Sequence, residues 1–163
     1  MSHATMWPET VQRVSSVFLD AAVDARVQEF KQGTPTAEDA ARAVGCDLAQ
    51  VVKSLVFVCD GAYVLALVPG DGRADEAKIG AAVGARAVRI ARAHEVLHAT
   101  GFDPGAVAPF PQRAIAQTVM DGTLLQHKEV WIGAGSSAHM AAIAPADLQR
   151  LARARAFDLL VHG

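Results

Sequence analysis

One lysine lies inside an apolar segment of the chain. The segment VVKSLVFV (residues 51–58) contains Lys53, one of only four lysines, while the chain has eleven arginines. An ammonium group is costly to remove from water, so a lysine in such a segment needs an explanation. Two interpretations are open: the amine reaches solvent along its apolar stem, or it lines a pocket at a sheet edge and binds an anionic or carbonyl-bearing ligand.

A loop rich in glycine and proline is the second candidate. The segment GFDPGAVAPFP (residues 101–111) is too punctuated for regular structure. Glycine lets a backbone approach a ligand closely and leaves N–H groups free to point at that ligand. An ordinary long connection is the alternative, so the loop alone does not establish a binding site.

The third candidate is a run of small residues that leads to a histidine. The segment GAGSSAHM (residues 133–140) places Gly133, Gly135, Ser136 and Ser137 before His139. Side chains of so little bulk suit a wall that a ligand approaches closely. A lone histidine is more often structural than catalytic, so both roles of His139 stay open.

Other reactive residues lack the partners that their chemistry needs. His94 and His98 have the i, i+4 spacing of a helix face, but no carboxylate or cysteine motif completes a metal site. Cys46 and Cys59 form no CxxC pair, and we expect two reduced thiols. No GxSxG motif is present, and no GxGxxG motif follows a strand. We expect no metal and no cofactor, and the protease, zinc-enzyme and P-loop classes lose their support.

Composition favours one globular domain. The 163 residues are 52% hydrophobic and 20% charged. The net charge of −2 gives no global attraction to nucleic acids, so an RNA partner needs a local basic patch and DNA is not expected. Neither a secretion signal nor a run of about 18 apolar residues is present, so we expect no membrane span and a cytoplasmic location.

The segment that contains Lys53 is predicted to be the first strand of a hairpin. Asp60-Gly61 follows it and is a strong signal for a type I′ turn, which needs positive φ at both central positions. Strand alternation puts Lys53 and Ser54 on opposite faces, and the other side chains of residues 51–58 are apolar. We therefore expect this strand to be covered on both faces.

The rest of the chain predicts intermixed helices and strands. Because strict βαβ alternation is absent, we predict an α+β fold in which helices pack on a mixed, largely antiparallel sheet, within a single domain of residues 1–163. Helices are predicted at residues 8–23, from Thr36 to Gly45, up to Gly84, at 92–101 and at 145–154 (with Leu148 and Leu151 inward), with a helical turn at 123–128. The further strands are predicted at residues 25–30, 85–91, 114–121, 129–135, 139–145 and 157–163.

Three separated segments together resemble the YbaK/prolyl-tRNA-synthetase-associated domain family. They are TAEDAARAVGCDLAQVVKSLVF, TGFDPGAVAPFPQ and VWIGAGSSAHMAAIAPADLQRL, in the family's order, and the likeness covers about residues 30–155. Members are free-standing or inserted domains that hydrolyse mischarged aminoacyl-tRNA, chiefly tRNA(Pro). The resemblance implies a barrel-like sheet with surrounding helices, to which the N-terminal helix is a small extension.

The resemblance also implies roles for individual residues. Lys53 matches the family's essential lysine and Gly133 the glycine of the later strand-turn. His139 falls where alanine-editing members are histidine-like and cysteine-editing members tend to carry aspartate. These three are the expected catalytic residues, while Ala106 and Pro111 depart from the family's loop, which has glycine at both positions. The expected substrate-binding residues are Thr36, Ser54, Gly101, Phe102, Gly105, Pro109, Phe110, Gly135 and Ser136.

The implied function is that of a trans-editing aminoacyl-tRNA deacylase for tRNA(Pro) carrying a small amino acid such as alanine or cysteine. Lys53 is expected to bind the terminal phosphate or ribose, and N–H groups near residues 101–105 to hold the ester carbonyl. A water near Gly133, assisted by His139 or by the ribose hydroxyl, is expected to attack. The expected partners are the acceptor end of mischarged tRNA and prolyl-tRNA synthetase. A non-catalytic module that binds a small ligand or an RNA end is the alternative.

Overall fold

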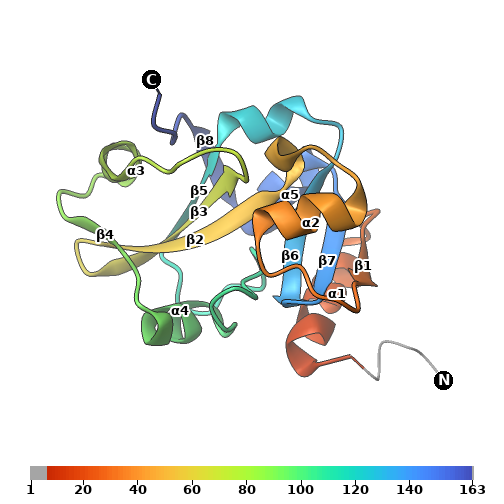
Figure 1. The fold of residues 1–163 in the computed structure, drawn as a ribbon. Helices are drawn as coiled ribbons and strands as arrows, with labels where there is room; N and C mark the ends of the chain where they lie inside the picture. The colour runs from red at the N-terminus through yellow and green to blue at the C-terminus, as the bar shows by residue number, and fades with distance from the viewer. Residues whose placement is uncertain (1–6, 163) are drawn as a thin grey trace.

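Two β-sheets share one hydrophobic core in the computed structural model, which describes residues 7–162 (Figure 1). The strand order is β1-β7-β6 in the first sheet and β4-β2-β3-β5-β8 in the second. The strands are β1 (Arg26–Glu29), β2 (Val52–Cys59), β3 (Ala62–Pro69), β4 (Val88–Ile90), β5 (Gln117–Asp121), β6 (Val130–Ser136), β7 (His139–Ile143) and β8 (Ala154–Phe157).

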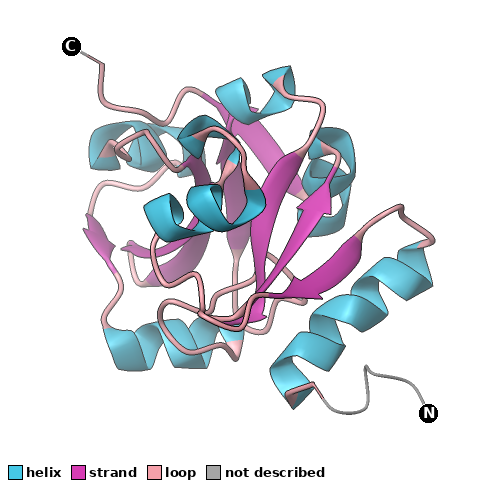
Figure 2. Ribbon diagram, turned by 45° about the vertical axis from the view of Figure 1, so that its right-hand side comes forward, coloured by secondary structure: helices cyan, strands magenta, loops and turns pink. Residues whose placement is uncertain are grey.

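Helices surround both sheets (Figure 2). None of them, within the range from residue 7 to residue 162, has the length and apolar character needed to cross a membrane. The α-helices are α1 (Glu9–Ala21), α2 (Ala37–Val44), α3 (Glu76–Val83), α4 (Ala93–Thr100) and α5 (Pro145–Ala152), and the 3₁₀ helices are η2 (Leu48–Gln50) and η3 (Gly122–Gln126).

Antiparallel pairing predominates, which confirms the predicted α+β class with a mixed sheet. The pairs β3/β5 and β5/β8 are parallel, and the pairs β1/β7, β6/β7, β2/β3 and β2/β4 are antiparallel. The family resemblance implied a barrel-like sheet, and for the described residues this expectation of a closed sheet was wrong. Within residues 7–162 the strands form two separate sheets, and the Val51–Trp131 contact between them is an isolated bridge rather than a paired strand, so the sheets are not closed into a barrel.

The predicted hairpin around Asp60-Gly61 is confirmed. Both turn residues have positive φ, 49° at Asp60 and 84° at Gly61, as a type I′ turn requires. The turn sets the register of β2 and β3, which pair from Cys59 with Ala62 to Val52 with Pro69. Lys53 is thereby fixed opposite Val68, near the start of β2.

Helix α2 begins and ends at its predicted caps. The Thr36 hydroxyl oxygen accepts a hydrogen bond from the Asp39 N–H at 3.1 Å, and Gly45 has a φ of 73°. Its buried Ala40 packs with Trp131 of β6 and Met140 of β7. In Figure 1 the helix accordingly lies in front of these two strands.

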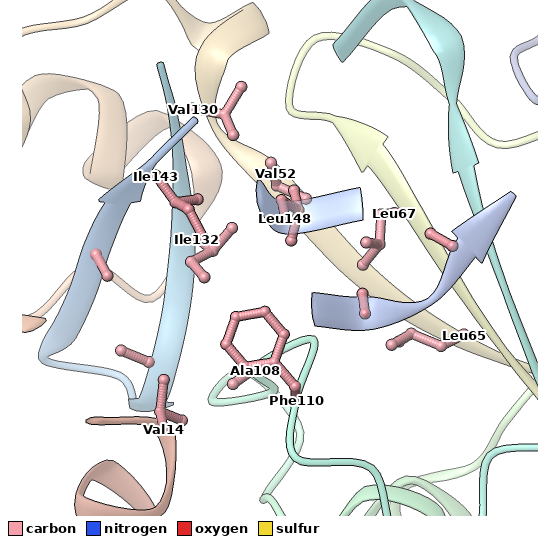
Figure 3. Close-up of a cluster of buried hydrophobic side chains, with 14 of the residues drawn as sticks. Val14, Val52, Leu65, Leu67, Ala108, Phe110, Val130, Ile132, Ile143 and Leu148 are labelled. Atoms are coloured by element: carbon pink, nitrogen blue, oxygen red, sulfur yellow. The ribbon is translucent and has the colours of Figure 1, made fainter. Parts of the chain in front are cut away.

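The main core lies between the two sheets (Figure 3). Val52 belongs to this core, whereas Phe57 belongs to a second cluster on the other face of the same sheet, so β2 is covered on both faces as predicted. Leu148 of α5 is fully buried, as predicted, and Leu151 is partly buried against the same core. Figure 3 shows Ile132 and Ile143 from the first sheet facing Leu65 and Leu67 from the second.

The last strand is the main error among the predicted elements. A strand was predicted at residues 157–163, but β8 spans Ala154–Phe157 and pairs with β5. Leu159 and Leu160 are buried because they pack in the second cluster, and Leu159 donates its N–H to the Asp121 carboxylate at 2.9 Å. Leu160 forms only an isolated bridge with Ala74, and neither residue belongs to a strand, so their apolar character mainly reflects core packing. Gly163 lies outside the described residues.

Candidate active site

A pocket of about 340 Å³ opens where the two sheets meet. Four segments line it: residues 34–37 together with Ala40 of α2, the start of β2 at residues 51–55, the loop residues Gly105 and Val107, and residues of the β6–β7 region between Gly133 and Met140. This volume is at the lower end of those of typical ligand pockets. The pocket therefore suits a small chemical group rather than a large ligand.

Lys53 lies at the edge of this pocket. Its side chain is half-buried, and its Nζ donates a hydrogen bond to the Gly72 carbonyl oxygen at 2.7 Å. An ammonium group has three N–H donors, so two remain after this bond. The carbonyl of the segment after β3 thus holds the lysine amine in place, and the amine keeps donors for an anionic ligand.

Ser54 contributes a buried hydroxyl to the same pocket. Its Oγ is shielded from solvent and makes no hydrogen bond with any residue in the described range. An unpaired buried hydroxyl costs about 1–3 kcal/mol, so such a group is a natural partner for a bound water or ligand. Although alternation along β2 puts Lys53 and Ser54 on opposite faces, both residues line the pocket, which opens around the start of this strand.

His139 is buried and has a protein group near each ring nitrogen. Only 3% of the residue is exposed, and its Nδ1 lies 2.5 Å from the Ser136 Oγ. Its Nε2 lies 3.4 Å from Oε2 of Glu29, within ion-pair range but without the geometry of a hydrogen bond. The Trp7 ring meets the imidazole edge-on, with 5.5 Å between the ring centroids.

The surroundings of His139 favour the neutral imidazole. Burial lowers its pKa below the ordinary value of 6.5, and the Glu29 carboxylate opposes that shift without cancelling it. A neutral imidazole has one N–H donor and one acceptor nitrogen. His139 can therefore accept a hydrogen bond at one nitrogen while it donates at the other.

Gly133 and the loop at residues 101–111 approach each other at the pocket. A Cβ atom on Gly133 would lie 2.8 Å from the Val107 carbonyl oxygen, a distance that real Cβ atoms do not adopt. Gly105 in the same loop has a φ of 84° and open space around it. Glycine is therefore needed at residue 133 for close approach, and at residue 105 for its backbone conformation.

The aromatic residues of this loop anchor it rather than line the pocket. Phe102 and Phe110 are almost fully buried in the main core, and Phe110 meets Phe18 of α1 edge-on at 5.6 Å. Pro109 is buried, and Gly101 ends α4 with a φ of 79°. These four residues hold the loop in position from behind.

Gly135 also lies outside the pocket lining, because it packs against α1. A Cβ atom there would lie 2.6 Å from the Thr10 carbonyl oxygen, and φ is 99°. The Thr10 hydroxyl donates to the Gly135 carbonyl oxygen at 2.7 Å. Gly135 therefore joins the N-terminal helix to β6.

The structure brings seven of the twelve predicted site residues to one pocket. The other five (Gly101, Phe102, Pro109, Phe110 and Gly135) lie outside its lining, and the catalytic and substrate-binding roles of all twelve stay predictions. Of the two loop departures, Ala106 donates its N–H to the Asp103 carbonyl oxygen in a turn, and Pro111 is half-buried outside the pocket lining. The seven that line the pocket are Thr36, Lys53, Ser54, Gly105, Gly133, Ser136 and His139.

Three residues at or beside the pocket carry no signal in the sequence: Thr34, which lines it, and Glu29 and Trp7, which contact His139. Glu29 is more than 100 positions from His139, and only the pairing of β1 with β7 makes the two residues neighbours. Thr34 donates its N–H to the Ser137 carbonyl oxygen at 2.6 Å, which attaches the 34–37 segment to the β6–β7 turn. No local sequence signal predicts these contacts.

Across residues 7–162, no three His, Cys, Asp or Glu side chains gather in a way that could hold a metal ion. The chemistry that this pocket offers comes from one cation, two serine hydroxyls, a buried imidazole and backbone N–H groups. Such groups can position an ester and a water molecule.

Comparisons with known proteins agree with the family resemblance of the sequence. The model of the aminoacyl-tRNA editing domain family matches residues 31–151. YwhH, an uncharacterized protein of Bacillus subtilis, is 32% identical over 123 residues, which cover 75% of this chain and 78% of YwhH. A proline–tRNA ligase of Xanthomonas oryzae is 30% identical over 124 residues. That match covers 76% of this chain but only 22% of the ligase.

A solved structure supports the fold assignment. It is described as that of a proposed trans-editing enzyme for prolyl-tRNA synthetase, and it superposes with a TM-score of 0.89 at 33% identity. The match covers 96% of this chain and 99% of that one. The match of the family model to residues 31–151, most of the chain, shows that the protein belongs to the aminoacyl-tRNA editing domain family.

Proposed function

We propose that this protein is a trans-editing deacylase that hydrolyses the ester of mischarged tRNA(Pro) carrying a small amino acid such as alanine or cysteine. The observation that carries the proposal is the pocket of about 340 Å³ with Lys53 at its edge, in a chain of the editing family. The likeness to proline–tRNA ligases supports tRNA(Pro) as the substrate and the synthetase as its source. Such a substrate is met in the cytoplasm.

A second hydrolytic site removes the wrong amino acids that a synthetase cannot exclude by binding alone. One methylene group in a binding pocket is worth only about 1–3 kcal/mol, so a synthetase cannot strongly exclude a smaller amino acid. The ester between amino acid and ribose is already activated, and its hydrolysis needs placement, water and donors for the developing oxyanion. The proposed reaction therefore needs no covalent nucleophile from the pocket.

In this proposal each part of the pocket has one role. Lys53 binds the terminal phosphate or ribose with the N–H donors that Gly72 leaves free. Backbone N–H groups near Gly105, where the loop is open, hold the ester carbonyl. A water between Gly133 and the ester attacks, assisted by the ribose hydroxyl. His139, whose ring nitrogens face Ser136 and Glu29, acts by holding Ser136.

A panel of charged tRNAs tests the proposal. Purified protein is incubated with tRNA(Pro) carrying alanine, cysteine, serine, 2-aminobutyrate or proline, and release of the amino acid is followed over time. We expect hydrolysis of at least one ester of a small amino acid and little release of proline. Tight binding of every member without hydrolysis would contradict the proposal and favour a non-catalytic module that binds an RNA end.

A further inference from the structure

Glu29, His139 and Ser136 form a row that leads from the protein surface to the pocket. Glu29 of β1 and His139 of β7 are directly paired across the two antiparallel strands, so their side chains lie on the same face. The Glu29 side chain is 49% exposed, whereas His139 is buried and Ser136 lines the pocket. Polar groups along this row can transmit a preference in proton position from Glu29 to Ser136.

The Glu29 carboxylate selects the position of the imidazole proton. Its oxygen lies 3.4 Å from Nε2, and a carboxylate attracts an N–H group but repels a nitrogen lone pair. The proton of the neutral ring therefore belongs on Nε2, which leaves Nδ1 as the acceptor. Lys53, on the other sheet, is the cation of this pocket, and Trp7 and Thr10 bring no charge to this end of it.

This tautomer fixes the direction of the Ser136 hydroxyl. The acceptor Nδ1 lies 2.5 Å from Ser136 Oγ, so the serine donates its hydrogen to the histidine. The same Oγ accepts the Ala138 N–H at 3.0 Å. A hydroxyl oxygen has two lone pairs, so one remains. At the pocket, Ser136 therefore presents an acceptor and no donor.

The charges at the pocket and behind it are complementary to those of an aminoacylated RNA end. Lys53 places a cation on the β2 side, and Glu29 places a carboxylate behind His139 on the β7 side. A terminal nucleotide that carries an amino acid has a negative phosphate at one end and a positive α-ammonium group at the other. The ammonium group has only donors, so it needs an acceptor of the kind that Ser136 offers.

We propose that Ser136 Oγ accepts a hydrogen bond from the α-ammonium group of the aminoacyl ester, and that His139 and Glu29 are positioning residues that keep Ser136 an acceptor. The inference rests on the proposed deacylase function and names the group of the substrate that this part of the site reads. It makes Ser136 the residue that distinguishes an aminoacyl ester from a simple acyl ester.

Two esters that differ only in the α-amino group test the inference. Single-turnover hydrolysis is measured with alanyl-tRNA(Pro) and with propanoyl-tRNA(Pro), each relative to its spontaneous rate. A hydrogen bond to a charged group is worth enough that Ser136→Ala is expected to slow alanyl release by about 10- to 100-fold. Propanoyl release is expected to change less than about twofold, because that ester has no ammonium group and so makes no hydrogen bond to Ser136 that the variant could remove. Ser137→Ala, at the exposed neighbouring serine, is the matched control and is expected to leave both rates unchanged.

The positioning role of Glu29 has its own readout. In Glu29→Gln, alanyl release is expected to fall by about 3- to 10-fold while propanoyl release is unchanged, since the amide no longer selects one tautomer. Nitrogen-15 spectra of the imidazole are expected to show the proton on Nε2 in the wild type and a mixture of tautomers in Glu29→Gln. Glu76→Gln, at an exposed first-turn residue of α3, is the control.

The outcomes separate the two levels of the account. Equal slowing of both esters by Ser136→Ala, in a protein whose wild type is active, overturns the role of Ser136 and leaves the deacylase function standing. A wild type that hydrolyses neither ester overturns the function itself, and the assignment of Ser136 with it. If Ser136→Ala does not fold, Ser136→Cys, whose thiol is somewhat larger than the hydroxyl but a much weaker acceptor, gives the same comparison.

Discussion

Gly133 and Val107 lie so close that a Cβ atom at residue 133 would come within 2.8 Å of the Val107 carbonyl oxygen. The obstacle is backbone rather than the end of a flexible side chain, so the loop must move if the glycine is replaced. This contact connects β6 to the loop at residues 101–111 beside the pocket. Both Gly133 and Val107 line the pocket, so a change in the separation of these two segments changes its shape.

The replacement Gly133→Ala is expected to displace the loop at Val107 and to slow deacylation by at least about tenfold, because a misplacement of about 1 Å at a reacting centre can cost 10²-fold. The same overpacking is expected to lower the free energy of unfolding by about 1–3 kcal/mol. Single-turnover hydrolysis and urea unfolding measure the two effects.

Gly122→Ala is the matched control, since a Cβ there would meet no atom closer than 3.8 Å. A Gly133→Ala variant that hydrolyses the ester at the wild-type rate would contradict the close contact.

Short-range signals predicted most elements of the fold. Asp60-Gly61 set a hairpin because only a few residues adopt positive φ easily, and Thr36 with Gly45 set the bounds of α2 through local capping bonds. The strand predicted for the C-terminal segment was wrong because long-range packing, rather than a local signal, determines its structure. Leu159 and Leu160 are apolar because the second cluster buries them, and local pattern cannot distinguish that packing from a strand.

The site residues also divide into those with a local signal in the sequence and those without one. Lys53 and Ser54 stood out because a charge and a hydroxyl interrupt an apolar strand, and both line the pocket. Glu29 has no such signal, because its importance arises from the pairing of β1 with β7. Gly135 belongs to a conspicuous small-residue segment, yet the structure uses it to seat α1. A run of glycines indicates that another group lies close to the backbone, but it does not distinguish a ligand from another segment of the protein.

The attachment of α1 to β6 gives a prediction about stability. Gly135→Ala combines a φ of 99° with a Cβ only 2.6 Å from the Thr10 carbonyl oxygen, so we expect a loss of about 2 kcal/mol or more in the free energy of unfolding. Thr10→Val removes only the hydrogen bond to the Gly135 carbonyl and is expected to cost about 1 kcal/mol. Urea unfolding ranks the two variants, and the opposite order would contradict this packing.

The low pKa of His139 predicts a loss of stability in mild acid. Burial makes the folded protein bind a proton at His139 less readily than the unfolded chain does, whose pKa is near 6.5. The unfolded state therefore holds more protons as the pH falls below 6.5, so the free energy of unfolding decreases there. The contribution of neutral His139 to the free energy of unfolding is fully present above pH 6.5 and is lost as the pH falls through the pKa of the folded state.

The slope due to this one group can reach about 1.4 kcal/mol per pH unit. His139→Gln is expected to lack this part of the pH dependence. The difference in the free energy of unfolding between wild type and variant should therefore shrink steadily as the pH is lowered from 7 to 5. Glu29→Gln removes the charge that raises the pKa of His139, and should steepen the loss. Parallel stability curves for wild type and His139→Gln would show that burial does not depress this pKa.

The central claim is that Lys53 binds the phosphate or ribose of the RNA end while the pocket hydrolyses the ester. The direct measurement is single-turnover deacylation of alanyl-tRNA(Pro) by the wild type, Lys53→Ala and Lys53→Arg, with Lys128→Ala as a control at an exposed lysine. A lost charge-assisted hydrogen bond predicts a rate roughly 10- to 150-fold lower for Lys53→Ala. Lys53→Arg, which keeps the charge, should retain more activity, and Lys128→Ala should match the wild type. A Lys53→Ala variant that releases alanine at close to the wild-type rate would contradict the account.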